Sequence, residues 1–314
     1  MTAALALLGY ATAAAWWSPV LLGRLTGSGA SVRPGLVAWL SAMASVLVAA
    51  GLGAAGIAQN AAAEWPILTR LLCQGVAGTA CTPQVYGSVA YSAGVAVLAV
   101  LVTLAALAAV WRYGRRTQRA VVKTRRHARA ALMAGRELAG TGAVVLDDPR
   151  PVAYCVAGRP AAIVVTSGAI SVLNEMQLTA VLAHERAHLA GRHPLLTTLT
   201  RGLAATFPRV PLFTRGADEV ARLAELAADD TAARSASPGD LVTALLAIAT
   251  GTAVPGTATA PQGTLAAAGY AVPARVQRLL HPPAHRTTAT FALLLGVVSA
   301  IFVLVPAALA TMAG

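Results

Sequence analysis

Two histidines and a glutamate are spaced so that they could bind a metal ion and use it. The segment reads His184-Glu185-Arg186-Ala187-His188, in a chain that has only six histidines. On a helix, residues four apart lie on one face about a turn apart, so the two imidazoles can share one ion. Glu185 projects further round the helix and can take a proton from a water molecule that the metal activates. The motif predicts a zinc-dependent hydrolase.

A second acidic segment offers a third metal ligand. Zinc peptidases with this motif need one more protein ligand and leave a fourth position to water. Glu225 lies in a run of polar and Ala/Leu residues with helical spacing, and Asp229 follows four residues later on the same face. Alone, the two carboxylates would indicate a solvated helix face. With the upstream motif, we expect Glu225 to bind zinc, one ion per chain, and Asp229 to accept the free N–H of a ligating histidine.

A peptidase also needs a donor for the negative charge that develops on the scissile carbonyl oxygen. The candidate donors are His193, Arg275, Tyr270, His281 and His285. His193 follows His188 by five residues, one short of the spacing of a third histidine ligand in metzincins, so a three-histidine site is rejected. A polar side chain near the helix end is the simpler interpretation of His193.

The composition places this site in a membrane protein. The chain of 314 residues is 57% hydrophobic and only 11% charged, whereas a soluble domain carries about a quarter charged residues. Four stretches without Lys, Arg, Asp or Glu are long enough to cross roughly 30 Å of hydrocarbon as helices. They cover about residues 3–22, 35–58, 88–111 and 288–312.

The distribution of charge predicts the orientation. The net charge is +12, and Lys and Arg near span ends mark the cytoplasmic side. Basic residues lie between the first two stretches, in a dense run over 112–136 and just before the fourth stretch, and every acidic residue except Glu64 falls within 112–287. The basic run is interpreted as a topological anchor to anionic lipid, since no signature of nucleic-acid binding accompanies it.

These patterns predict a mainly α membrane protein with its N-terminus outside. Residues 1–111 would form three spans with an outer loop over 60–85. Residues 112–287 would form a cytoplasmic α+β domain that carries the metal site, inserted before a fourth span and short outer tail over 288–314. Cys73 and Cys81 lie in the predicted outer loop, where oxidising conditions would allow a disulfide. Cys155 has apolar neighbours and is expected to be a buried thiol.

Local signals outline the predicted domain. A basic helix should leave the membrane and continue to about residue 138. Val-rich runs separated by turn signals predict three strands, at 143–146, 152–156 and 162–166. Asn174 is a plausible N-cap, with Gln177 completing a capping box, for the helix that carries the metal motif. Further segments are an interfacial helix and turn over 195–213, the Glu225 helix, helices at 238–250 and around 275–280, and a loop over 251–268.

The arrangement of three spans, the motif from His184 to His188, the downstream Glu225-x-x-Ala-Asp229 and a fourth span resembles the BlaR/MecR-type membrane zinc metallopeptidases, which are gluzincins. The segments Ile163–Gly168 and Leu182–Leu189, and Arg192-His193 after the motif, also resemble the HtpX and CAAX-protease relatives. The resemblance implies His184, His188 and Glu225 as zinc ligands, Glu185 as general base and later proton donor, and Asp229 as a supporting group.

The resemblance further implies that strand 152–156 or strand 162–166 offers an exposed edge, to which an extended peptide substrate adds. One departure is expected, because the chain lacks the large penicillin-binding sensor that follows the fourth span in the β-lactam receptors. Sensing would then use the outer loop, the spans or a partner.

The leading functional hypothesis is a zinc endopeptidase of the bacterial cytoplasmic membrane that cuts a cytoplasmic protein, such as a BlaI-like transcriptional repressor in a signalling circuit. The first alternative is an HtpX-like protease for the quality control of membrane proteins. A second is a silent transmembrane signalling scaffold with structural zinc, which the presence of Glu185 disfavours. An intramembrane site-two protease is disfavoured by Arg186 within the motif, by Arg192 shortly after it and by the short flanks of the motif.

Overall fold

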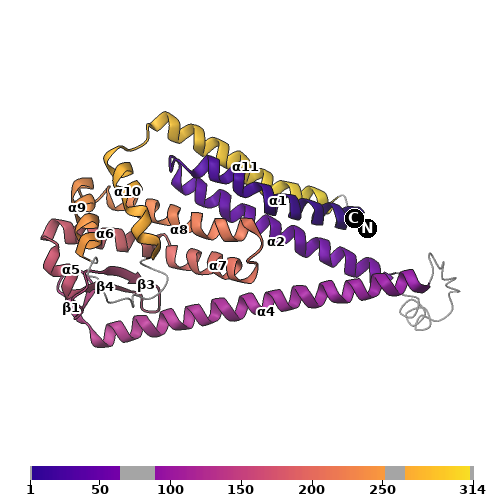
Figure 1. Cartoon of the computed structure of the whole chain (residues 1–314), viewed down its shortest axis with the longest axis horizontal. Coiled ribbons are helices and arrows are strands. Elements are labelled where there is room, and N and C mark those ends of the chain that lie inside the picture. Colours follow the sequence, from indigo (N-terminus) through magenta and orange to yellow (C-terminus); the bar gives the residue numbers. More distant parts are fainter. Residues whose placement is uncertain (1, 64–88, 252–265, 312–314) are drawn as a thin grey trace.

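Four long helices dominate the computed structural model, which describes residues 2–63, 89–251 and 266–311 (Figure 1). Three of them form a bundle: α1 (Thr2–Thr26), α2 (Val32–Ala63) and α11 (His285–Thr311). The fourth, α4 (Val89–Ala134), runs along the opposite side of the molecule. Each contains a stretch long and apolar enough to cross a membrane. The four predicted apolar helices are therefore present.

The burial of apolar side chains differs between the bundle and α4. In the bundle, Trp39 of α2 is fully buried and packs in one core with Leu22 of α1 and Leu295 of α11. On α4, by contrast, Leu101 and Leu104 are more than half exposed, at 58% and 57%. Apolar side chains on the outside of a long helix suit contact with lipid tails. This pattern agrees with a membrane-embedded protein.

A small sheet lies between helices at one end of the molecule (Figure 1). Its strand order is β1-β2-β4-β3, where β2 and β4 are parallel and the outer pairs are antiparallel. The strands are β1 (Arg136–Leu138), β2 (Ala143–Leu146), β3 (Ala153–Val156) and β4 (Ala162–Thr166). Alternation along β4 turns Val164 toward Ala128 of α4, and Ile163 and Val165 toward Val181 of the helix on the other face. The sheet is thus a platform between two helices.

The structure corrects two expectations for this sheet. The helix leaving the membrane does not reach residue 138, because it ends at Ala134 and the next residues form β1. The exposed edge of β2 offers backbone partners to Arg136–Leu138, and this pairing overrides their helical preference. In addition, β4 is not an edge strand, because it lies between β2 and β3. The remaining edge candidate is therefore β3.

Six further helices lie around the sheet and beside the bundle in the described part of the chain: α5 (Ser167–Val172), α6 (Glu175–Ala190), α7 (His193–Thr206), α8 (Pro211–Ala232), α9 (Pro238–Gly251) and α10 (Ala266–Leu280). The predicted capping box is confirmed, because Asn174 and Gln177 each bond the backbone N–H of the other at 2.9 Å. Helix α7 contacts α4, and α8 packs on α2 with Leu212 and Leu223 in the core of the bundle. The domain is therefore anchored to the long helices.

The turn into α5 makes a stability prediction. The N–H of Gly168 bonds the carbonyl oxygen of Asp148 at 2.9 Å, and a Cβ at Gly168 would collide with the backbone carbonyl of Pro149. Backbone cannot yield as a side-chain tip does, so we expect Gly168→Ala to cost about 1–3 kcal/mol and to lower the midpoint of thermal unfolding by several degrees. In Gly114→Ala, the added methyl group meets nothing within 4 Å. That control should unfold at or above the wild-type temperature, and equal midpoints for the two variants would contradict the packing described.

Candidate metal centre

Two helices bring three ligand atoms together. His184 and His188 lie one turn apart near the end of α6, and Glu225 lies on α8, which packs against α6. The Nε2 atoms of the two histidines are 3.0 Å apart. Glu225 Oε2 lies 3.6 Å from His184 Nε2, and Oε1 lies 3.5 Å from His188 Nε2. One atom from each residue thus falls in a cluster no wider than 4.8 Å.

The cluster fits a zinc ion. Zinc takes imidazole nitrogen and carboxylate oxygen at about 2.0–2.2 Å, and tetrahedral geometry then sets its ligands about 3.3 Å apart. The three separations in this centre lie close to that value. Both histidines are buried, whereas the Glu225 side chain is 35% exposed. A fourth ligand could therefore approach from the open side.

Each histidine has a polar neighbour at its Nδ1 atom, on the side of the ring opposite the Nε2 atom. Asp229 Oδ1 lies 3.0 Å from His184 Nδ1, at the length of a hydrogen bond though not with its alignment. His193 Nδ1 lies 3.0 Å from His188 Nδ1. This contact puts His193 on the side of the His188 ring away from the Nε2 cluster, so its geometry does not suit the expected role as an oxyanion donor.

Arg275 of α10 contacts both carboxylates of the centre. Its Nε and Nη2 atoms donate to the two carboxylate oxygens of Asp229, each at 2.7 Å. Its Nη1 lies 3.2 Å from Glu225 Oε2, and Nη2 lies 3.5 Å from His184 Nε2. The guanidinium is buried and in reach of a group bound at the centre. Arg275 therefore remains the predicted oxyanion donor, although sequence reasoning missed its forked pair with Asp229.

Oppositely charged groups at the centre stabilise one another's ionised forms. Burial opposes ionisation of both carboxyls. His184, His188 and Arg275 nevertheless hold the pKa of Glu225 below its usual range, and Arg275 and His184 do the same for Asp229. Burial alone would lower the pKa of His184, but Asp229 and Glu225 raise it to about 9. The pKa of His193 falls to about 4 because of burial and the adjacent His188. The carboxylate of Glu225 is thus held in the ionised form that a metal ligand requires.

Glu185 follows His184 in the chain and lies near strand β3. It is buried on α6, and its carboxylate interacts with the thiol of Cys155 on β3. Burial, with this carboxylate nearby, raises the pKa of that thiol. Cys155 is a free cysteine that is half-buried, so it is less buried than its apolar neighbours predicted. Glu185 therefore lies between the ligand cluster and strand β3.

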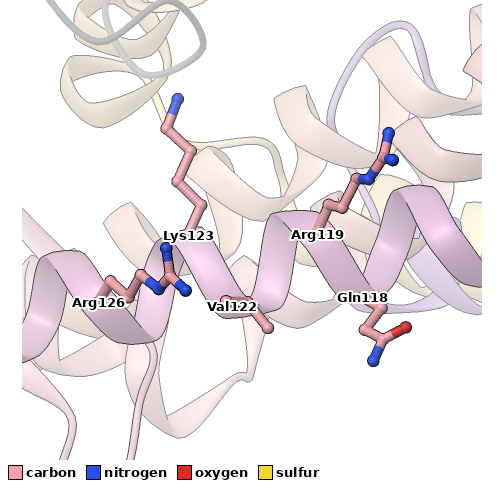
Figure 2. Close-up of a pocket in the computed structure, with 5 residues that line it drawn as sticks. All are labelled: Gln118, Arg119, Val122, Lys123 and Arg126. Carbon is pink, nitrogen blue, oxygen red and sulfur yellow. The ribbon is translucent and has the colours of Figure 1, made fainter.

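Two other features predicted from the sequence lie away from the centre. Cys73 and Cys81 fall outside the described residues. Most of the basic run over 112–136 lies on α4, and part of it lines a pocket of about 460 Å³ (Figure 2). That pocket is bordered by Gln118, Arg119, Val122, Lys123 and Arg126. None of these residues belongs to the candidate metal centre.

A His-Glu-x-x-His helix whose histidines meet a glutamate from a second helix defines the zinc metallopeptidases of the two-histidine-plus-glutamate type. Comparison with family models identifies a peptidase family within this class. Residues 115–282 match the model of peptidase family M48, and the chain belongs to this family. It is therefore a member of a family of metallopeptidases.

Curated relatives agree over a shorter region. The chain is 36% identical to the protease HtpX homologue of Acidiphilium cryptum over 80 residues, which cover 24% of this chain and 28% of the relative. It is 32% identical to the protease HtpX homologue of Ralstonia nicotianae over 83 residues, which cover 25% and 29%. The chain thus spans less than a third of the length of these relatives. No solved structure gives a significant match.

Proposed function

We propose that this chain is a membrane-bound zinc endopeptidase that cleaves protein segments at the cytoplasmic face of a bacterial membrane. The convergence of His184, His188 and Glu225 on one point, with Glu185 beside them, carries the proposal. The match to family M48 supports the same reaction class. A structural zinc site in a silent scaffold is disfavoured, because such a site has no use for a free carboxylate like that of Glu185.

The positions of the basic residues support the proposed orientation. The turn between α1 and α2, the basic part of α4 and the start of α11 all lie at the end of the molecule that carries the metal centre (Figure 1). Arg24, Arg33 and Arg286 lie in or beside these segments. Because basic residues favour the cytoplasmic side, the domain would be cytoplasmic and the N-terminus outside.

Different residues of this chain would carry out different steps of peptide hydrolysis. A zinc ion held by the three ligands would supply a Lewis acid that polarises the scissile carbonyl and lowers the pKa of water toward about 7. Glu185 would accept the proton as water attacks and later donate it to the leaving amine. Arg275 would donate hydrogen bonds toward the negative charge that develops on the carbonyl oxygen. Asp229 would hold the ring of His184 in place.

The sheet suggests how a substrate would be positioned. Among the described strands, β3 pairs with β4 on one side and has no strand on the other. Its Cys155 lies against Glu185. An extended peptide that added to the free edge of β3 would therefore pass beside the general base, held by backbone hydrogen bonds that require no particular sequence.

The likeness to HtpX homologues favours substrates of the quality-control kind, damaged or misfolded membrane proteins, over a BlaI-like repressor. An edge strand that binds a substrate through backbone hydrogen bonds would accept such varied sequences. Comparing the proteins that accumulate in cells with an inactive chain would separate the two proposals. Many membrane proteins should accumulate in the quality-control case and a single regulator in the other.

Removal of the metal tests the proposed function directly. We expect the full chain in detergent to hold about one zinc ion and to cleave fluorescently labelled, unfolded casein. A chelator should abolish cleavage, and zinc added in slight excess should restore it, because the Lewis acid cannot be replaced by side chains. Cleavage that survives complete loss of metal, or a chain that binds zinc but cuts no protein under any condition, would overturn the proposal.

A further inference from the structure

His193 has a second histidine as its nearest polar partner. It is the first residue of α7, and its ring is buried, with 6% of its surface exposed. Its Nδ1 lies 3.0 Å from Nδ1 of His188, and the two rings meet edge to face with centroids 4.9 Å apart. Because only one of two facing ring nitrogens carries a proton, one ring donates and the other accepts.

A metal on the other side of His188 decides which ring donates. Nε2 of His188 points at His184 and Glu225 and would bind the ion through its lone pair. A neutral imidazole that coordinates through Nε2 carries its proton on Nδ1. His188 would then donate, and Nδ1 of His193 would accept.

We propose that His193 is a positioning residue that fixes the tautomer and the ring orientation of His188 by accepting its Nδ1 proton. This inference rests on the proposed function, because it concerns the hold of the same metal ion. Asp229 stands behind His184 in the same way. The two ligands would thus have different supports, an anion behind His184 and a neutral ring behind His188.

The local backbone is shaped to place this ring. The chain reverses directly after α6, with Arg192 in the left-handed conformation at φ 51°. At Gly191 a Cβ would collide with Nε2 of His193. The absence of a side chain at residue 191 therefore lets the imidazole fold back over the end of α6 and reach His188.

Variants that separate hydrogen bonding from packing test this role. His193→Phe keeps a flat ring of similar size without an acceptor, and His193→Gln restores an acceptor oxygen without the ring. We expect the zinc affinity of the full chain, measured by competition with a chelator, to fall about 10- to 100-fold in the phenylalanine variant, as is typical when a partner of a ligating histidine is lost. The glutamine variant should stay within a few-fold of wild type.

His281→Phe supplies the matched control. His281 was a candidate donor, but it follows the last residue of α10, is exposed, and among the described interactions bonds only the backbone of Gln277, so it does not support a ligand. Its zinc affinity should equal that of wild type, and the zinc-free forms of all three variants should unfold within a few degrees of one another. If His193→Phe binds zinc as tightly as wild type, or if His193→Gln is as weak as His193→Phe, the positioning role is wrong. A wild-type chain without tight zinc would instead overturn the proposed function and this inference together.

Discussion

Glu185→Gln should abolish proteolysis without changing the zinc content. The amide has nearly the same shape as the carboxylate but cannot accept a proton. Because Glu185 is not one of the three clustered candidate ligands, we expect its replacement to leave zinc binding intact. Loss of a general base typically lowers the rate of catalysis about 10²- to 10⁴-fold. We expect a fall of this size in casein cleavage by the zinc-loaded chain, at equal zinc content by elemental analysis.

Glu175→Gln makes the same chemical change on the same helix. Glu175 is exposed in the first turn of α6, about two and a half turns before the motif, so this variant should cleave at the wild-type rate. An active Glu185→Gln chain would remove the general base from the proposed mechanism. Loss of zinc in that variant would instead show that Glu185 helps to bind the ion.

The ligand pair on α6 could be predicted because it is encoded within one helix. Helical spacing alone brings His184 and His188 to one face, and the capping box at Asn174 fixes where that helix begins. Glu225 and Asp229 were predicted from the same periodicity on α8. These signals are local, and they place the candidate ligands on the faces of their helices before any tertiary packing is known.

The contacts of Arg275 and His193 could not be predicted in this way. Arg275 reaches Asp229 across 46 residues of sequence, and nothing in a short basic helix indicates which carboxylate it will pair with. His193 was interpreted as a polar helix end, because the reversal at Arg192 does not show in hydrophobic periodicity. Gly191, two residues before His193, was the available signal, since a residue without a side chain often marks a close approach.

In the sheet, too, local sequence predicts some features and tertiary packing determines the others. The Val-rich runs predicted β2, β3 and β4, but β1 forms only because the edge of β2 is free to pair with it. Strand order is likewise a tertiary property. The sequence left two candidates for the edge strand, and the packing of β4 between β2 and β3 removes one of them.

Glu225→Ala should lose both the metal and the activity, which distinguishes a ligand from a general base. Its carboxylate faces both Nε2 atoms, at 3.6 and 3.5 Å. Two imidazoles alone make a weak site for zinc, so we expect the affinity to fall by more than the roughly 10- to 100-fold that loss of a supporting partner costs. Zinc at 100 times its wild-type dissociation constant should stabilise the wild-type chain by about 2.7 kcal/mol. The same concentration should leave the unfolding temperature of Glu225→Ala almost unchanged.

The zinc-free Glu225→Ala chain should still fold, because Arg275 keeps its forked pair with Asp229 and no buried charge is left without a partner. Glu219→Ala is the matched control. It removes a carboxylate from the same helix, one that pairs with Arg222 away from the centre, and it should keep both zinc and cleavage. If Glu225→Ala bound zinc as tightly as Glu219→Ala, the ion would have to be held by other groups, and the assignment of α8 as the source of the third ligand would be wrong.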